Sequence, residues 1–548
     1  MGGIQQMNIL GNTVLSRKHL LVSILAIVLV VCGIYANSLY NGFVLDDELI
    51  IAGNPATRQL SNISDLLFAP DVIKPYYRPL NRASYLIDYQ VFGLNPLWFH
   101  AVNIIIHALN AVLLYLVASR LLADRSAALV AALLFAAHPA NSEAVNFISA
   151  RNTLLAVCFS LASLLAFLKA REKDVRLPLL SAFLFFLGLL SKETAFMLIV
   201  VIAIYTVFPS PWFAGKMLRH RLTSLAPYLV GVVVYFAMRS YSLQGVLGVD
   251  IAGGDLFSRL AMNYHIVPQY VGLLLFPADL TIFHAVPNGN IFTPFWFLPV
   301  WIALFISAWL IVRRGNTAAL FGLVWCAVNY APISNIIPIP SEPITERFLY
   351  MPAAGFFIIV GALIEHLNAD VRRRRAVTAA AAVIMLLCSA MTIQRNRDWR
   401  DDPALFASGV KNDPASAEAH CNLGTALLLD KGDIEAARQE WEAALGIDPN
   451  NSDALIQMGT YAAMKGDLRK AEQLYLSALL SPPGKSDPDK SMAHFNLGKI
   501  YDKQQRPTDA LRQYELFLKL ATLRYAEYKP FAEQRVEYLR NVMSSITK

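Results

Sequence analysis

The sequence predicts an all-α protein in two parts: a polytopic transmembrane helix bundle followed by a short α-solenoid of helical hairpins. The first observation is composition. Of the 548 residues, 56% are hydrophobic and only 16% are charged, whereas soluble chains are about 45–50% apolar and about 25% charged. The second is a series of apolar runs that alternate with short polar loops. The third is a repeat of small and aromatic residues that follows them.

The first apolar run, Leu20 to Ala36, follows Arg17 and Lys18. It is longer than the hydrophobic core of a signal peptide, and many further runs come after it. We therefore expect an uncleaved first helix whose N-terminus lies in the cytoplasm, because basic residues favour that side of a membrane. Residues 41–97 then form the first extracytoplasmic loop.

Ten further apolar runs follow, and clusters of basic residues lie between alternate runs. Because such clusters favour the cytoplasm, they predict about 11 spans and a C-terminal part outside the cytoplasm. This count requires that residues 264–277, which are short for a span, do not cross fully; whether they span or re-enter is left open. The runs are 98–120, 126–138, 152–169, 177–190, 195–209, 222–240, 294–312, 317–333, 351–367 and 376–393, and the basic clusters are Arg120 with Arg125, Lys169 to Arg176, Lys216 to Arg221, Arg313 with Arg314, and Arg372 to Arg375.

From about residue 396 the apolar fraction falls and a repeat appears, with Gly459, Ala471 and Tyr475 at key positions of one unit. The spacing matches the tetratricopeptide repeat (TPR) pattern, in which small residues let two helices pack closely and an aromatic ring fills the gap to the next unit. We therefore predict a transmembrane domain at 1–395 and an extracytoplasmic TPR domain at 396–548. The repeats are placed at about 417–450, 452–485 and 491–524, with a C-terminal capping helix after them.

The predicted outer loops carry an unusual share of the ionisable residues near lipid, and such residues are functional candidates. A carboxylate suits a general base, and arginine suits phosphate because its planar fork bonds two oxygens. The pattern predicts a site that deprotonates one group while holding a phosphate. The candidate catalytic acids are Asp47, as first choice, and Asp46, with Glu48 and Glu143 as supporting acids. The candidate phosphate ligands are Arg347, Lys192, Arg78, Arg82 and Arg151. His138, Glu193 and Glu346 are expected to support these ligands without contacting the phosphate.

Each candidate also has a structural interpretation, because ion pairs that only stabilise the fold produce similar patterns. Lys192 and Glu193 could pair with each other in a tight hairpin, and His138 could cap a helix. Glu346 could form a structural pair with Arg347, or orient it toward a phosphate. The gathering of these residues on one membrane face favours the functional interpretation. No glycine-rich phosphate loop, Ser-His-Asp order or zinc-ligand spacing is present in the sequence.

Six motif stretches and the repeats follow one another in a fixed order. They are Asn41 to Asp47, Tyr77 to Leu80, Phe99 to Asn103 with His107, His138 to Val145, Ser191 to Glu193, and Glu346 to Pro352, followed by Trp399 and the TPR array. In this combination the chain resembles the GT-C class of membrane glycosyltransferases. More closely, it resembles the transmembrane and TPR repeat-containing O-mannosyltransferases and their bacterial relatives.

The resemblance implies a polyprenyl-phosphate sugar donor whose lipid tail lies in the membrane. Asp46 and Asp47 match the family's catalytic acidic motif. An acceptor hydroxyl, on Ser or Thr of an extracytoplasmic protein, would attack with inversion at the sugar carbon. Arginine or lysine would stabilise the departing phosphate. No metal ligands are implied, although acids near a phosphate could hold a divalent cation.

The expected partners are the lipid-linked donor, a protein acceptor, membrane lipid and a protein or peptide bound by the TPR domain. Nucleic acid is not expected, because the net charge of +7 is spread over loop clusters. Two locations remain open: a bacterial inner membrane with the TPR domain in the periplasm, or an endoplasmic reticulum membrane with the TPR domain in the lumen.

Other functions compete with this interpretation. A non-catalytic, membrane-anchored TPR scaffold does not explain why acids and bases gather on one face. A transporter would place its charges near mid-bilayer within the spans, whereas here they lie at span ends. A ligase or polymerase of lipid-linked glycans is the third alternative.

Overall fold

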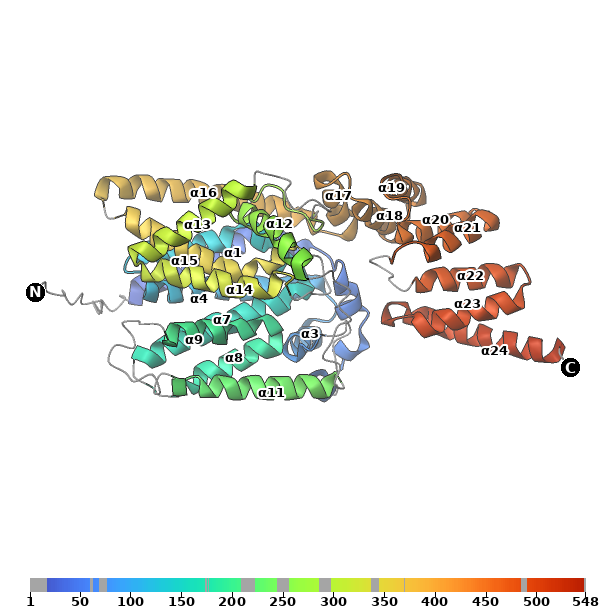
Figure 1. Cartoon of the computed structure of the whole chain (residues 1–548), viewed down its shortest axis with the longest axis horizontal. Coiled ribbons are helices and arrows are strands. Elements are labelled where there is room, and N and C mark those ends of the chain that lie inside the picture. Colours follow the sequence, from blue (N-terminus) through green and yellow to red (C-terminus); the bar gives the residue numbers. More distant parts are fainter. Residues whose placement is uncertain are drawn as a thin grey trace, which may run out of the picture.

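The computed structural model confirms the all-α fold: a bundle of long helices is followed by a row of helical hairpins that extends from one end of the bundle (Figure 1). All regular structure within the described residues is helical. These residues are 17–59, 63–68, 76–172, 175, 177–207, 222–243, 256–284, 297–336, 344–368, 370–483 and 490–546. The predicted basic cluster Lys216 to Arg221 lies outside them, as does part of the cluster Lys169 to Arg176.

The bundle packs around one hydrophobic core, to which α4, α5, α7 and α15 contribute most of the buried side chains. Many of these are alanines, and small residues let helices approach closely in a membrane. The bounds are α1 (Arg17–Tyr35), α2 (Ile63–Phe68), α3 (Pro79–Phe92), α4 (Pro96–Leu121), α5 (Arg125–Ala137), α6 (Ser142–Asn146), α7 (Arg151–Glu172), α8 (Leu179–Ser191), α9 (Met197–Val207), α11 (Ala226–Ser242), α12 (Leu256–Leu275), α13 (Phe297–Arg314), α14 (Thr317–Tyr330), α15 (Tyr350–Leu367) and α16 (Val371–Asp398).

Six helices in the described part of the chain are long and apolar enough to cross a membrane, and α5 with the bent segment Pro139–Asn146 could form a seventh span. Shorter apolar helices cover Leu179–Ser191, Glu193–Val207 and Thr317–Ile333. The protein is therefore a multi-pass integral membrane protein. The helix α12, which includes most of 264–277, is not among the candidate spans and contains Pro268. The count of eleven spans stays a prediction.

The C-terminal part contains three helical hairpins, with one further helix before them and one after them. Each hairpin has a glycine in its first helix that faces an aromatic ring in its second. A Cβ atom at Gly459 would lie 2.6 Å from the ring of Tyr475, so a larger side chain would displace the ring. The three pairs are Gly424 with Trp441, Gly459 with Tyr475, and Gly498 with Tyr514. The predicted repeat packing is confirmed. The bounds are α17 (Asp402–Asn412), α18 (Ala417–Lys431), α19 (Ile434–Ile447), α20 (Ser452–Met464), α21 (Leu468–Leu480), α22 (Ser491–Lys503), α23 (Pro507–Leu520) and α24 (Lys529–Ile546).

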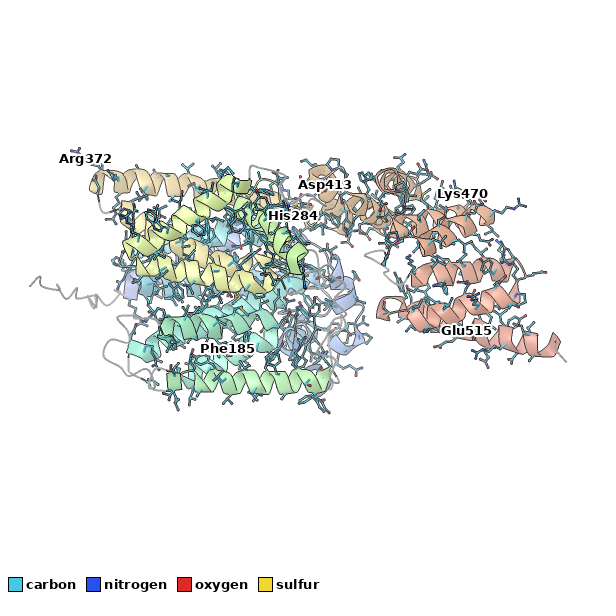
Figure 2. The ribbon with its side chains drawn as sticks, viewed as in Figure 1. Phe185, His284, Arg372, Asp413, Lys470 and Glu515 are labelled. Carbon is cyan, nitrogen blue, oxygen red and sulfur yellow. The ribbon has the colours of Figure 1, made fainter. Side chains whose placement is uncertain are left out.

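The two parts meet at the end of α16. This helix begins near Arg372, at the end of the bundle away from the hairpins (Figure 2). It continues past the predicted boundary at residue 395 because its polar end is stabilised: Arg395 pairs with Asp398 at 3.0 Å. The segment that carries the candidate acids packs here, since the N–H of Gly42 donates to the carbonyl of Arg400 at 2.9 Å. The loop with the candidate acids therefore lies against the start of the repeat domain.

Candidate functional site

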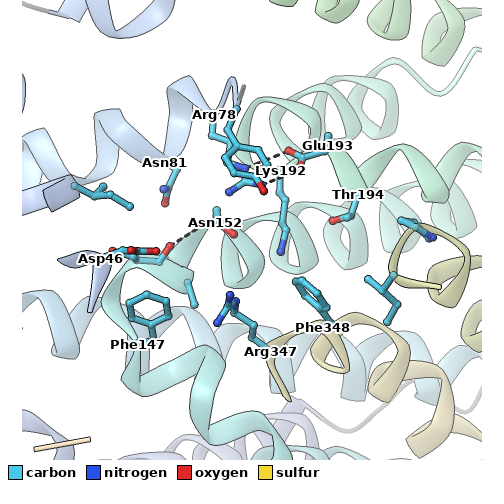
Figure 3. Close-up of a pocket in the computed structure, with 16 residues that line it drawn as sticks. Asp46, Arg78, Asn81, Phe147, Asn152, Lys192, Glu193, Thr194, Arg347 and Phe348 are labelled. Atoms are coloured by element: carbon cyan, nitrogen blue, oxygen red, sulfur yellow. Dashed lines mark hydrogen bonds and ion pairs between the residues drawn. The ribbon is translucent and has the colours of Figure 1, made fainter. Parts of the chain in front are cut away.

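A pocket of about 190 Å³ is lined by residues from segments that lie far apart in the sequence (Figure 3). Several helices begin or end at its wall. The helix α3 begins directly after Arg78, α8 ends just before Lys192, and α15 begins soon after Arg347. The N-terminal ends of α3 and α15 carry partial positive charge, which favours an anion nearby. The pocket thus joins three of the predicted cations in a setting suited to a negative group.

Arg78 is fixed at the wall by Glu193. Its Nε and one Nη donate to the two carboxylate oxygens of Glu193 at 3.1 and 2.7 Å. The guanidinium also lies over the ring of Tyr76, 4.0 Å from the ring centroid. A two-point pair of this kind sets the plane of the guanidinium as well as its position.

Arg347 is fixed by Glu143, a residue more than two hundred positions earlier in the chain. Glu143 is only 2% exposed and accepts a hydrogen bond from the backbone N–H of Arg347 at 2.9 Å. It also accepts one from the guanidinium of the same residue. The rings of Phe147 and Phe348 flank this guanidinium at 5.5 and 5.6 Å. Arg347 therefore reaches the pocket in one held orientation.

The prediction that Glu346 orients Arg347 is wrong. Neighbouring residues of the short 3₁₀ helix Glu346–Phe348 point in different directions, and Glu346 is fully buried. Its carboxylate lies 3.6 Å from Arg395 and 3.4 Å from the imidazole of His284. Glu346 thus belongs to a buried charged group behind the pocket.

Lys192 points toward Arg347 from the opposite wall (Figure 3). Its ammonium donates to the hydroxyl of Thr153 at 2.8 Å and forms no ion pair with any described residue. Burial, together with the guanidinium groups of Arg78 and Arg347, lowers the pKa of Lys192 to about 7. A negatively charged ligand would reverse this shift, because an opposite charge favours the protonated form.

The three acids of the first loop have different environments. Asp46 is exposed and lines the pocket. Asp47 is fully buried, where one carboxylate oxygen accepts from the backbone N–H and hydroxyl of Ser149 at 2.7 and 2.5 Å. Burial raises the pKa of Asp47 to about 7. Glu48 lies outside the pocket wall, near Asp430 of the repeat domain. The geometry therefore reverses the order of preference from the sequence, because Asp46, and not Asp47, lines the pocket that the three cations also line.

Three more predicted residues, like Asp47, Glu48, Glu143 and Glu346, lie outside the pocket wall; they are Arg82, Arg151 and His138. Arg151 is fully buried, and its guanidinium donates to Asp88 at 2.5 Å and to Asn103 at 2.7 Å. Arg82 is also buried, at 5% exposure. The imidazole of His138 accepts from the N–H of Ala140 at 3.3 Å, which is the helix-cap role of the structural alternative. Arg82 and Arg151 are therefore not placed to hold a phosphate in this pocket.

Several residues of the wall were not among the predicted site residues. They are neutral hydrogen-bonding or aromatic side chains, which carry no charge signal in a sequence. Some of them are adjacent in the sequence to a predicted residue; Phe348, for example, directly follows Arg347. Their position in the motif could have indicated them. They include Tyr76, Asn81, Phe147, Ser149, Asn152, Thr194 and Phe348.

A divalent cation has no evident ligands in this arrangement. Within the described ranges, no group of three or more His, Cys, Asp or Glu side chains is placed to hold a metal ion. The pocket wall offers instead three cationic side chains and two carboxylates, Asp46 and Glu193, the second of which is paired with Arg78.

Comparisons with known proteins support the resemblance found in the sequence. Residues 86–243 match the family described as "Dolichyl-phosphate-mannose-protein mannosyltransferase", and residues 417–451 match the tetratricopeptide repeat. The first match includes Glu143, Ser149 and Lys192 of the site but neither Asp46 nor Arg347.

Several curated proteins are similar to this chain over most of its length. The mouse protein O-mannosyl-transferase TMTC3 is 28% identical over 503 residues, which cover 82% of this chain and 54% of the mouse protein. Human protein O-mannosyl-transferase TMTC1 is 27% identical, over 78% of this chain and 55% of its own length. The Caenorhabditis elegans protein O-mannosyl-transferase F38B6.6 is 27% identical, over 76% and 61%. The chain thus spans little more than half the length of these relatives.

Proposed function

We propose that this chain, similar to the TMTC protein O-mannosyl-transferases, is a GT-C-type membrane glycosyltransferase. It moves a sugar from a polyprenyl-phosphate donor to the hydroxyl of Ser or Thr in a protein. The observation that carries the proposal is the placement of the carboxylate of Asp46 in one pocket with Arg78, Lys192 and Arg347. The names of the relatives suggest mannose as the sugar.

The phosphate of the donor binds among the three cations. Arg78 and Arg347 are already ion-paired with carboxylates, whereas Lys192 forms no ion pair with a described residue, so its ammonium is available to the phosphate. As the bond between the sugar carbon and the phosphate oxygen breaks, its electron pair leaves with that oxygen. The growing negative charge is stabilised by cations that are already in position, which is an effective way to lower a barrier.

The acceptor hydroxyl is activated by Asp46 in this proposal. The carboxylate takes the proton while the hydroxyl oxygen bonds to the sugar carbon from the side opposite the phosphate, which inverts that carbon. Asp47 instead fixes the backbone segment that carries Asp46, because its carboxylate accepts two hydrogen bonds from Ser149. Glu48 has no direct part.

The repeat domain lies on the extracytoplasmic side in this proposal, in the periplasm or the lumen of the endoplasmic reticulum. The acceptor protein reaches the pocket from that side and is held by the TPR helices. The prenyl tail of the donor lies in the surrounding lipid. The domain division at residues 395 and 396 is part of the same proposal.

The test is sugar transfer by the full-length protein in lipid nanodiscs. Polyprenyl-phosphate mannose and Ser/Thr-rich peptides are supplied, and mass spectrometry measures the addition of one hexose. We expect transfer from the lipid-linked donor and none from a nucleotide-linked sugar. Peptide binding without transfer would favour the scaffold, and transfer only to lipid-linked glycans would favour the ligase or polymerase.

A further inference from the structure

Leu45 has a backbone conformation that leucine rarely adopts, with a φ angle of +53°. It is the first central residue of a tight turn, closed by the N–H of Asp47 donating to the carbonyl of Val44 at 3.0 Å. Turns with a positive φ at this position ordinarily have glycine there. Such strain persists only where the surroundings hold the backbone in place, and it is typical of functional sites.

The turn sends three consecutive side chains in different directions. Leu45 packs against Phe406 and Leu423 of the repeat domain. Asp46 lines the pocket, and Asp47 turns inward to Ser149. The conformation of Leu45 therefore decides that Asp46, rather than its neighbour, faces the cations.

Asp402, the first residue of α17, holds this turn. Its carboxylate accepts a hydrogen bond from the backbone N–H of Leu45 at 2.9 Å. Helix capping does not explain its place, because Asp401 is the residue whose side chain caps α17, accepting from Ala404 at 2.8 Å. The neighbouring charges do not favour a carboxylate at position 402 either. Burial and the nearby carboxylates, Asp430 first among them, raise the pKa of Asp402 to about 6.

We propose that Asp402 is a positioning residue for the membrane pocket: it holds the strained turn at Leu45 and thereby directs Asp46 at the acceptor hydroxyl. The repeat domain is then a structural part of the reacting site and not only a protein-binding module. The effect on turnover rests on the proposed function; the effect on the turn does not.

The experiment compares Asp402→Ala, Asp402→Asn and Asp430→Asn in the full-length protein. Hydrogen exchange of the segment 41–48 is measured together with turnover and donor affinity. Asp402→Ala should speed exchange at Leu45 and lower turnover by roughly 10²-fold, a typical effect of misplacing a reacting group by about 1 Å. Donor affinity should persist, because the cations do not contact Asp402.

The other two variants are the controls. Asparagine keeps an oxygen that accepts from Leu45, so Asp402→Asn should behave like the unaltered protein in exchange. Asp430→Asn removes a charge near Glu48 and Asp402 but keeps the hydrogen bond to Leu45, so it should leave exchange at Leu45 and turnover unchanged. Normal exchange and turnover in Asp402→Ala would overturn the proposal, as would a parallel loss of donor affinity and thermal stability. An unaltered protein that transfers no sugar would refute the proposed function, while the exchange data would still test the turn.

Discussion

Replacing Glu143 with glutamine should release Arg347 from its held orientation. Glu143 is 2% exposed and accepts from both the backbone and the guanidinium of Arg347. Glutamine keeps the size and one accepting oxygen, so the variant loses mainly the charge. Hydrogen bonds to charged groups contribute about 1.5–3 kcal/mol. Because about 1.4 kcal/mol corresponds to a tenfold change in affinity, we expect donor binding to weaken roughly ten- to a hundredfold.

The matched comparison is Glu346→Gln. It removes an equally buried charge beside Arg347 in the sequence, but one that faces Arg395 and His284. A fluorescent polyprenyl-phosphate analogue, titrated into protein in nanodiscs, measures the dissociation constant for both variants. Glu143→Gln should weaken binding, whereas Glu346→Gln should lower the melting temperature and leave binding intact. The reverse pattern would refute the geometry and restore the orienting role that the sequence predicted for Glu346.

Two further variants test other parts of the structure. Burial and two neighbouring guanidinium groups lower the pKa of Lys192 to about 7, so this side chain is charged below that pH and neutral above it. Donor affinity should therefore fall as the pH rises from about 6 to about 8. The variant Lys192→Arg stays charged over this range, so its affinity should change little with pH. A steep dependence of affinity on pH in that variant would assign the titration to another group. A methyl group at position 459 would lie 2.6 Å from the ring of Tyr475. Gly459→Ala should destabilise the repeat domain by about 1–3 kcal/mol, as overpacking does, with donor affinity unchanged, and an unaltered melting temperature would contradict this packing.

Features set by local patterns could be predicted from the sequence. The apolar runs indicated the bundle because a span must be continuously apolar. The spacing of Gly459 and Tyr475 indicated the hairpins because helix packing requires a small residue opposite a large one. The position of His138 before a proline indicated its capping role.

The details of the pocket depend on contacts between distant segments, which no local pattern specifies. Glu143 and Arg347 are 204 positions apart, so the adjacent Glu346 was the natural candidate for orienting the arginine. Arg78 and Arg151 both lie in polar loop motifs of the sequence. Only the fold shows that Arg151 pairs with Asp88 and so differs from Arg78. The choice between Asp46 and Asp47 depends on a single φ angle at Leu45.

The most direct test of the account is the turnover of Asp46→Asn with a saturating lipid-linked donor. Asparagine cannot take the proton of an acceptor hydroxyl, and a positioned base typically contributes about 10²–10⁴-fold. Turnover should fall by that factor while donor affinity and expression persist, because Asp46 is exposed. Asp47→Asn should lose less, since the amide oxygen of asparagine can still accept from Ser149. Normal turnover in Asp46→Asn would contradict its role as the base, and normal turnover in both variants would remove the catalytic role of this loop.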